Sequence, residues 1–370
     1  MKLFVTCIAG VESILNKEIE RLKYKILKTS DRYVYCETDD AGIARVNLWS
    51  RVGNKVHLEL NSGIVNNFDD LFELVSEINW KDYVDSSNPI IVNAVSIKSW
   101  LDSIPAIQKT SKKAIVTKIT GSKDEYLFED TNLQPREILI FIEDNECRVL
   151  LNTSGEALHK RGYRTSEHEA PIKESLGAAL VLLSGWSYKK PLYDFFCGSG
   201  TIAIEAALIS RNIAPGSLGR KFAFEDFGGY PATHLEEAKK EAEAKSFKDK
   251  KYEIIASDID AYNVDMAKKN AENAGVSDTI KFEMKDFSAY LGAKKLEGTV
   301  VSNPPYGLRL DSNNLDKIYK DLAKIFNNNP DLNGGFITSY FDFDNMVNLD
   351  PWKKRKLYNG NEKCYFYKKV

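Results

Sequence analysis

The tetrapeptide Asn303-Pro304-Pro305-Tyr306 brings hydrogen-bond acceptors and an aromatic ring together at the end of the apolar run 298–302. Two consecutive prolines remove two backbone donors and fix φ at both positions, so the Asn303 side chain and the nearby carbonyls are held in one acceptor geometry. Such acceptors suit a planar amino group conjugated to a nucleobase ring, on which Tyr306 can stack. A strand-ending turn is the plainer alternative, since Asn and Pro are common turn residues.

A glycine-rich loop follows a second apolar run, 192–196. Gly198 and Gly200 let the backbone turn tightly and approach a ligand at the carboxyl edge of a sheet. The stretch 198–203 also fits the G-x-G-x-x-A form of a dinucleotide fingerprint, which is a weak signal alone. Asp194 favours S-adenosylmethionine over NAD as the cofactor, because a carboxylate suits the cationic amino group of methionine better than a pyrophosphate.

Polar residues stand at the ends of the next two predicted strands as well. Asp258 fits a ribose diol, which both cofactors carry, while Asp286 can accept the adenine amino proton and Phe287 can cover the ring. Each alone is explained as a helix cap or turn residue, but the series along one sheet edge indicates one pocket. The predicted cofactor-binding residues are Asp194, Cys197, Gly198, Ser199, Gly200, Thr201, Asp258, Ile259, Asp286, Phe287 and Asn303, and the predicted catalytic residues are Asn303, Pro304, Pro305 and Tyr306.

The cysteines predict neither a metal site nor a disulfide framework, because they are scattered, odd in number and lack a C-x-x-C pair or a nearby histidine. Cys197 adjoins the glycine loop, but a small buried side chain explains it better than a nucleophile. The five cysteines are Cys7, Cys36, Cys147, Cys197 and Cys364.

From about residue 165, predicted helices alternate with short apolar strands, which is typical of a doubly wound parallel sheet. A long connection, 211–251, interrupts this pattern and indicates a functional insertion or a lid. The predicted helices are 172–184, 201–210 and 262–274, and the predicted strands are 192–196, 253–257, 280–284, 300–302 and 335–339.

The first half of the chain reads as two α+β units. Residues 1–45 show a strand, an amphipathic helix and two strands, and residues 41–80 contain helical stretches, the second of which Asn66 and Asn67 can cap. A β-rich run at 88–99, a helix at 107–119 and two strands at 137–144 and 146–154 then follow.

Composition sets the class of protein. A chain of 370 residues predicts two or three domains, and 43% hydrophobic with 28% charged residues describes a folded soluble protein. The apolar run 176–183 is too short to span a membrane and the first residues lack a signal-peptide pattern, so we expect the cytoplasm.

A net charge of −2 argues against indiscriminate coating of nucleic acid, so RNA contacts should be local. Three basic clusters could make such contacts, although a run of charge is more often a solvated face. They are Lys109, Lys112 and Lys113; His159, Lys160, Arg161 and Arg164; and Lys353, Lys354, Arg355 and Lys356.

The donor loop 194–201 (DFFCGSGT) together with Asn303–Tyr306 resembles the Rossmann-like S-adenosylmethionine-dependent methyltransferases that act on exocyclic amino groups. The whole chain is most similar to the THUMP-domain RNA guanine-N(2)-methyltransferases, above all those of bacterial 23S ribosomal RNA, through the further segments 151–164, 169–180 and 355–369. That resemblance implies a ferredoxin-like region (1–45), a THUMP domain that grips structured RNA (46–155) and a Rossmann-like methyltransferase domain (156–370). Leu308 departs from the acidic residue that such proteins often carry after this motif.

The resemblance implies methyl transfer to guanine N(2) in ribosomal RNA, with transfer RNA as the second choice. Adenine N(6) in DNA remains an alternative, because the same tetrapeptide occurs in DNA adenine methylases. A non-catalytic RNA-binding protein and an NAD oxidoreductase also stay open. We expect neither a metal nor a membrane partner, and the sequence leaves open the oligomeric state, the modified nucleotide and the number of methyl groups added.

Overall fold

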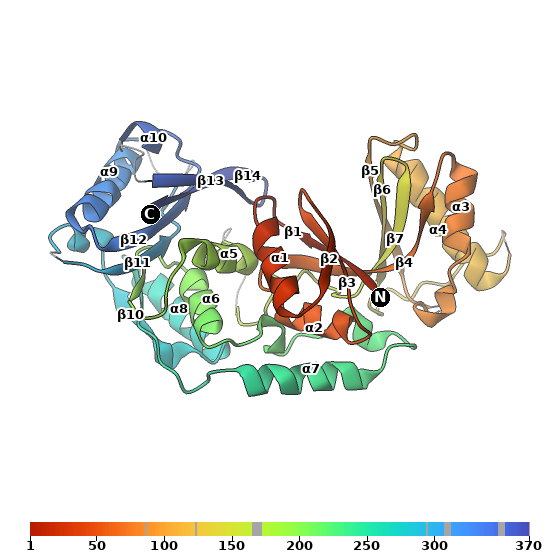
Figure 1. Ribbon diagram of the computed structural model, residues 1–370, viewed down its shortest axis with the longest axis horizontal. Coiled ribbons are helices and arrows are strands. Elements are labelled where there is room, and N and C mark those ends of the chain that lie inside the picture. The colour runs from red at the N-terminus through yellow and green to blue at the C-terminus, as the bar shows by residue number, and fades with distance from the viewer. Residues whose placement is uncertain are drawn as a thin grey trace.

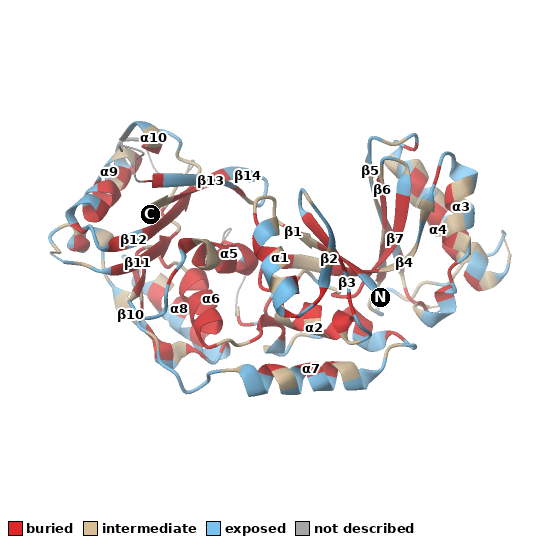
Figure 2. Ribbon diagram, in the orientation of Figure 1, coloured by how far each residue is buried: buried red, intermediate tan, exposed pale blue. Residues whose placement is uncertain are grey.

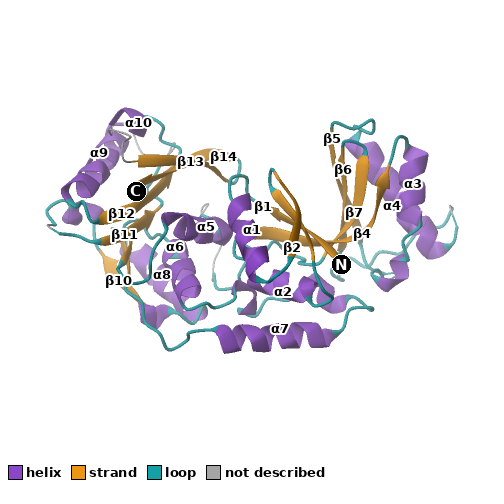
Figure 3. Cartoon of the chain, viewed as in Figure 1, coloured by secondary structure: helices purple, strands orange, loops and turns teal. Residues whose placement is uncertain are grey.

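The computed structural model describes residues 1–85, 87–122, 124–164, 172–293, 295–306, 312–346 and 352–369, and shows an elongated molecule with two β-sheets (Figure 1). The first sheet lies in the N-terminal half and the second in the C-terminal half (Figure 3). None of the described helices is long and apolar enough to cross a membrane.

The N-terminal sheet is continuous across the predicted junction at residue 45. Within the described residues it has seven strands in the order β2-β3-β1-β4-β7-β6-β5. β4 pairs with β1 on one side and with β7 on the other, so the two predicted α+β units share this strand. The strands are β1 Lys2–Cys7, β2 Lys25–Ser30, β3 Tyr33–Glu37, β4 Gly53–Ile64, β5 Ile90–Ile97, β6 Arg136–Glu143 and β7 Glu146–Asn152.

The predicted strand–helix–strand–strand order of the first residues is confirmed. β4 was missed, because only helices were expected between residues 41 and 80. Asn67 caps the second of those helices as predicted, since its side chain accepts a hydrogen bond from the backbone N–H of Asp70. The helices of this half are α1 Glu12–Arg21, α2 Gly42–Trp49, α3 Phe68–Ser76 and α4 Ile104–Thr120. The predicted domain boundaries at 45/46 and 155/156 stay a prediction.

The C-terminal sheet confirms the predicted doubly wound fold. Its described strands follow the order β10-β9-β8-β11-β12-β14-β13, and β10 to β12 run parallel. The chain turns to opposite sides after β8, so the carboxyl ends of β8 and β11 form the switch point at which such sheets bind ligands. The strands are β8 Leu192–Asp194, β9 Ile254–Asp258, β10 Ile280–Met284, β11 Gly298–Ser302, β12 Leu332–Thr338, β13 Trp352–Asn359 and β14 Glu362–Lys369.

Helices cover both faces of this sheet. Val301 packs into the core that contains α5, α6 and α8, whereas the adjacent Val300 packs into the core that contains α9. Every residue of α6 is buried (Figure 2). Both faces of the sheet are therefore closed, and ligands approach at its edges. These helices are α5 Glu174–Ser184, α6 Thr201–Ser210, α8 Ala261–Asn273, α9 Ser312–Asn328 and the short α10 Phe343–Met346.

The long connection after α6 is a strap between the two halves of the molecule. Its helix α7, Ala232–Lys245, runs beside α2 (Figure 1). Arg45 of α2 forms two hydrogen bonds with the Glu241 carboxylate, at 2.9 and 3.0 Å. The Tyr230 hydroxyl donates to the Asp40 carbonyl and accepts from the Ala44 N–H. These contacts favour an insertion that joins the halves over a lid at the sheet edge.

Glu241→Ala is expected to lower the free energy of unfolding by about 1 kcal/mol, because the lost pair is bidentate and only partly exposed. Urea denaturation measures this loss, and Glu237→Ala on the exposed side of α7 is the matched control. The affinity for S-adenosylmethionine should stay unchanged. A large change in that affinity would instead favour a lid.

Candidate functional site

The glycine loop between β8 and α6 is shaped by two glycines in the left-handed region. Gly198 has φ +49° and Gly200 has φ +83°. A Cβ on Gly200 would lie 2.9 Å from the Ala267 Cβ, so only glycine fits there without strain. The Gly198 N–H donates to the Asp258 carboxylate at 2.9 Å, which joins the loop to the end of β9.

Asp194 lies at the end of β8 with one carboxylate oxygen in use and one unused. Oδ1 accepts from the Ser302 hydroxyl at 2.9 Å, whereas Oδ2 is buried and has no hydrogen-bond partner among the described residues. Burial raises the pKa of Asp194 to about 7. A buried acceptor without a partner is costly, which indicates that a ligand group donates to it.

Ser302 is the link between the donor and acceptor motifs. Its hydroxyl donates to Asp194 and accepts from the Phe195 N–H at 2.7 Å, so it ties the end of β11 to the end of β8. Asn303 follows it directly. Sequence reasoning missed Ser302 because a serine at a strand end carries no pattern that reveals a partner 108 residues away.

A cavity of about 420 Å³ opens at this edge of the sheet. It collects five of the predicted site residues, Asp258, Ile259, Asp286, Phe287 and Pro305. The other residues that line it are Phe195, Phe196, Ser288, Asn314, Lys317, Ile318 and Asp321. The glycine loop and Asp194 lie beside this cavity and do not line it.

The walls of the cavity suit a flat aromatic ring. The rings of Phe196 and Phe287 lie with their centroids 4.8 Å apart, and Ile259 is 69% exposed. An apolar side chain so exposed at a cavity mouth has surface to bury against an apolar ligand. Phe196 was missed as a site residue.

Two carboxylates of the site also hold local structure. Both oxygens of Asp258 have partners, because Oδ1 accepts from the Asp260 N–H and from the Asn263 side chain while Oδ2 accepts from Gly198. Asp286 caps its own turn by accepting from the Ser288 N–H at 2.7 Å. Their predicted contacts with ribose and adenine stay predictions.

Helix α9 forms the wall opposite Asp286. Its side chains Asn314, Lys317, Ile318 and Asp321 lie along one side of the cavity. No helix was predicted there, although apolar residues recur at helical spacing from Leu315 to Phe326.

The acceptor motif, which follows β11, contains another side-chain oxygen that lacks a partner among the described residues, as Asp194 Oδ2 does. Oδ1 of Asn303 is buried and lacks a hydrogen-bond partner in the part of the chain that the structure describes. The Pro305 carbonyl is already held by the hydroxyl of Tyr319, which donates to it at 3.0 Å. Tyr319 is a fully buried residue of α9, so this helix fixes the path of the motif.

Tyr306 is held by the C-terminal hairpin. Its hydroxyl accepts from the Asn359 side chain at 3.0 Å, and burial raises its pKa, so the phenol stays neutral. Asn359 ends β13, a strand that was not predicted, although the Asn359-Gly360 pair between alternating residues is a hairpin signal. Leu308 lies outside the described residues.

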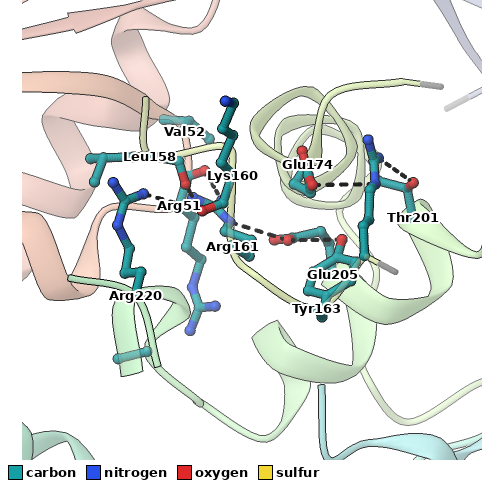
Figure 4. Close-up of polar contacts among 12 residues, drawn as sticks. Arg51, Val52, Leu158, Lys160, Arg161, Tyr163, Glu174, Thr201, Glu205 and Arg220 are labelled. Carbon is teal, nitrogen blue, oxygen red and sulfur yellow. Dashed lines mark hydrogen bonds and ion pairs between the residues drawn. The ribbon is translucent and has the colours of Figure 1, made fainter. Parts of the chain in front are cut away.

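An ionic network lies around Thr201 and Glu205 of α6, the helix that begins directly after the glycine loop (Figure 4). Arg164 donates to the Thr201 hydroxyl at 2.8 Å and pairs with Glu174. Arg161 pairs with Glu205 of α6 at 3.3 Å, and both side chains are almost fully buried.

This network corrects the interpretation of the second basic cluster. Arg161 and Arg164 were considered as RNA contacts, but they face inward and neutralise Glu205 and Glu174. A charged run at 159–164 looks the same in sequence whether it faces solvent or acids on another helix. A buried guanidinium needs such partners, because an unpaired charge is costly to bury.

Cys197 is buried beneath the loop, and burial raises its pKa well above the ordinary value. The structural role expected for it is therefore supported, since a protonated, enclosed thiol is a poor nucleophile.

The residues present fit S-adenosylmethionine. The unpaired Asp194 oxygen suits the methionine amino group, the glycine loop permits close backbone approach, and the Phe196–Phe287 wall with Ile259 suits adenine. These positions remain predictions for individual residues.

Comparison with known proteins shows the family of the chain. Residues 161–368 match the family model described as "RMKL-like, methyltransferase domain", and residues 2–57 match the RlmL ferredoxin-like domain. The "Putative RNA methyltransferase YpsC" of Bacillus subtilis is 38% identical over 99% of this chain and 94% of its own length.

Two further proteins are similar. The ribosomal RNA large subunit methyltransferase K/L of Buchnera aphidicola is 34% identical over 84% of this chain, which spans only 46% of that protein. The crystal structure of SMU.472, "a putative methyltransferase complexed with SAH", has a TM-score of 0.87 at 34% identity and covers 99% of this chain and 97% of that one. SAH is the product that S-adenosylmethionine leaves after giving up its methyl group. The chain therefore belongs to the RMKL-like methyltransferase family and is an S-adenosylmethionine-dependent methyltransferase.

Proposed function

We propose that this enzyme methylates the exocyclic N(2) of a guanine in RNA, with 23S ribosomal RNA as the first candidate. The observation that carries the proposal is two buried oxygens, Asn303 Oδ1 and Asp194 Oδ2, that have no hydrogen-bond partner among the described residues. Ser302, which directly precedes Asn303, donates to the other oxygen of Asp194 and so ties the two strand ends together. Asn303 Oδ1 would accept a hydrogen bond from the acceptor base, and Asp194 Oδ2 would accept one from the amino group of the cofactor. Both reacting molecules thus meet at the switch point of the sheet.

When bound, S-adenosylmethionine supplies a methyl group on a positively charged sulfur. Asn303 Oδ1 and the Pro304 carbonyl oxygen each accept a hydrogen bond from one N–H of the base's amino group, which localises the nitrogen lone pair. Tyr306, fixed by Asn359, stacks on the ring. Alignment of this kind accounts for several kcal/mol of barrier lowering. The methylated nitrogen becomes cationic and its proton acidic, so the proton is lost to water and a strong general base is unnecessary.

Support for RNA comes from the relatives, whose names describe an RNA methyltransferase and a large-subunit ribosomal RNA methyltransferase. The choice of guanine N(2) rests on the resemblance of the whole chain to that group. A base in a loop or bulge is the expected target, because unstacking it costs less than in a duplex. The proposed 46–155 THUMP unit would hold the surrounding RNA, and such an enzyme would work in the cytoplasm.

The test is transfer of a labelled methyl group to ribosomal RNA from a strain lacking the protein, followed by nucleoside analysis. Label in N(2)-methylguanosine supports the proposal. If only transfer RNA is labelled, the substrate is transfer RNA and not ribosomal RNA. If adenine in duplex DNA is labelled instead, the enzyme is a DNA adenine methylase and the proposal is wrong.

Tyr306→Phe and Asn359→Ala are each expected to lower kcat/KM about fivefold, since each removes one hydrogen bond that orients the stacking ring. The double variant should lose no more than either single variant, because both changes break the same contact. Steady-state kinetics on the RNA substrate measure this cycle, with Asn361→Ala in the hairpin turn as control. Fully additive losses would contradict a shared role.

A further inference from the structure

The C-terminal hairpin extends beyond the sheet at the edge where the acceptor motif lies. β14 pairs with β12 only as far as Tyr365, opposite Thr338. The hairpin itself continues to the Asn359–Glu362 pair. Its tip therefore projects past the carboxyl edge of the sheet, and there Asn359 contacts Tyr306.

The same hairpin touches the N-terminal half (Figure 1). Arg355 of β13 donates to the Gly10 carbonyl at 2.9 Å and to the Ser13 hydroxyl at 3.0 Å. Lys356 and Tyr358 line a hollow of about 530 Å³ together with Arg32. The hairpin therefore contacts both the N-terminal half and the acceptor motif.

One face of the hairpin carries three cross-strand pairs of lysine and tyrosine. Across the strands, each lysine stands opposite a tyrosine, and along each strand the residues on this face are all lysine or tyrosine. The three pairs of this lysine–tyrosine face are Lys354↔Tyr367, Lys356↔Tyr365 and Tyr358↔Lys363.

The cations of this face lie against the rings. Lys363 Nζ is 5.3 Å from the Tyr365 ring centroid and 5.7 Å from that of Phe341. Lys356 Nζ is 5.3 Å from the Tyr358 ring centroid. The Arg32 guanidinium, which lines the same hollow, lies 5.6 Å from the same centroid. Aromatic and cationic groups thus follow one another from Phe341 to Arg32.

The charges near the tip are available to a ligand. Lys354 is neutralised by Asp344, and its Tyr367 partner is buried. Lys356 and Lys363 are exposed, and neither forms an ion pair with a carboxylate among the described residues, although Glu12 and Asp31 also line the hollow. Single-stranded nucleic acid is bound by this combination, since cations meet the phosphates while rings stack on bases.

We infer that the lysine–tyrosine face, at Lys356, Tyr358, Lys363 and Tyr365, binds the single-stranded RNA that flanks the target nucleotide. This inference rests on the proposed function and adds to it a surface outside the acceptor pocket. The hairpin then has two tasks: one face of its tip orients Tyr306, and the other holds the strand that enters.

The test compares Lys356→Gln/Lys363→Gln with Lys353→Gln, which changes the same charge on the same strand but on the other face. The double variant is expected to raise the RNA KM roughly tenfold and to lower the log–log salt slope by about 1.4, since each lost phosphate contact accounts for about 0.7. The kcat and the affinity for S-adenosylmethionine, measured by calorimetry, should stay unchanged, which shows that the fold is intact. Lys353→Gln should behave as wild type.

Tyr358→Leu should also raise the RNA KM, roughly tenfold, but with the salt slope of wild type, because it removes stacking and no charge. An unchanged RNA KM and salt slope in the double variant, or an equal change in Lys353→Gln, overturns the inference. If the wild type methylates no RNA, the proposed function fails, and filter binding of a short mixed-sequence single-stranded RNA still decides the surface. Equal affinities of wild type and double variant would then overturn it.

Discussion

Asn303→Ala is expected to lower kcat on RNA by about 10³-fold, in the range seen when one preorganised hydrogen-bonding group is removed from an active site. The Asn303 side-chain oxygen is buried without a partner in the described chain, and the proposed contact with the base would use this acceptor. Affinity for S-adenosylmethionine should change less than about twofold, since the predicted amino contact is on Asp194. Single-turnover methyl transfer and calorimetry measure the two quantities.

Stability separates this result from simple misfolding. Removing a buried acceptor that has no partner costs little, so the melting temperature of Asn303→Ala should not fall. Asn327→Ala, an exposed change on α9, is the matched control for kinetics. Substantial turnover in Asn303→Ala would remove the acceptor role proposed for this residue.

The parts of the site that the sequence predicted are those encoded locally. Asp194, Asp258, Asp286 and Asn303 each end a short apolar run, and parallel strands bring such ends to one edge. The backbone geometry of the glycine loop follows from its own residues, because Gly198 and Gly200 adopt positive φ. Fold class and pocket position followed from these signals.

The missed parts depend on contacts between distant segments. Ser302 matters because it lies beside Asp194, and Asn359 because it lies beside Tyr306. Two basic clusters also differ in ways that only distant contacts decide, because Arg161 is buried against Glu205 while Lys356 is exposed. Charge is visible in sequence, but the partner that neutralises it is not.

Asp194→Asn is expected to weaken S-adenosylmethionine binding by about 10²–10³-fold at pH 7.5, because a neutral amide replaces the carboxylate that the methionine amino group would meet. Burial raises the pKa of Asp194 to about 7, so below that pH the wild-type carboxyl must lose its proton before binding. The wild-type Kd should therefore rise by up to about tenfold per unit as the pH falls below 7. Above pH 7.7–8.0, the ordinary range of an α-amino group, the affinity should fall again.

The Asp194 carboxyl also makes the free energy of unfolding of the free enzyme depend on pH. Its folded pKa exceeds the unfolded value, so its favourable contribution is present at low pH and is lost as the pH rises toward 7. Asp194→Asn should consequently be more stable than wild type at pH 8 and similar to it near pH 4, while its weak cofactor binding stays flat from pH 5.5 to 7. Thermal unfolding and calorimetry across that range measure both, and Asp265→Asn, an exposed carboxylate on α8, is the control. A wild-type Kd that does not respond to pH between 5.5 and 7 would show that Asp194 is not the group that receives the amino end of the cofactor.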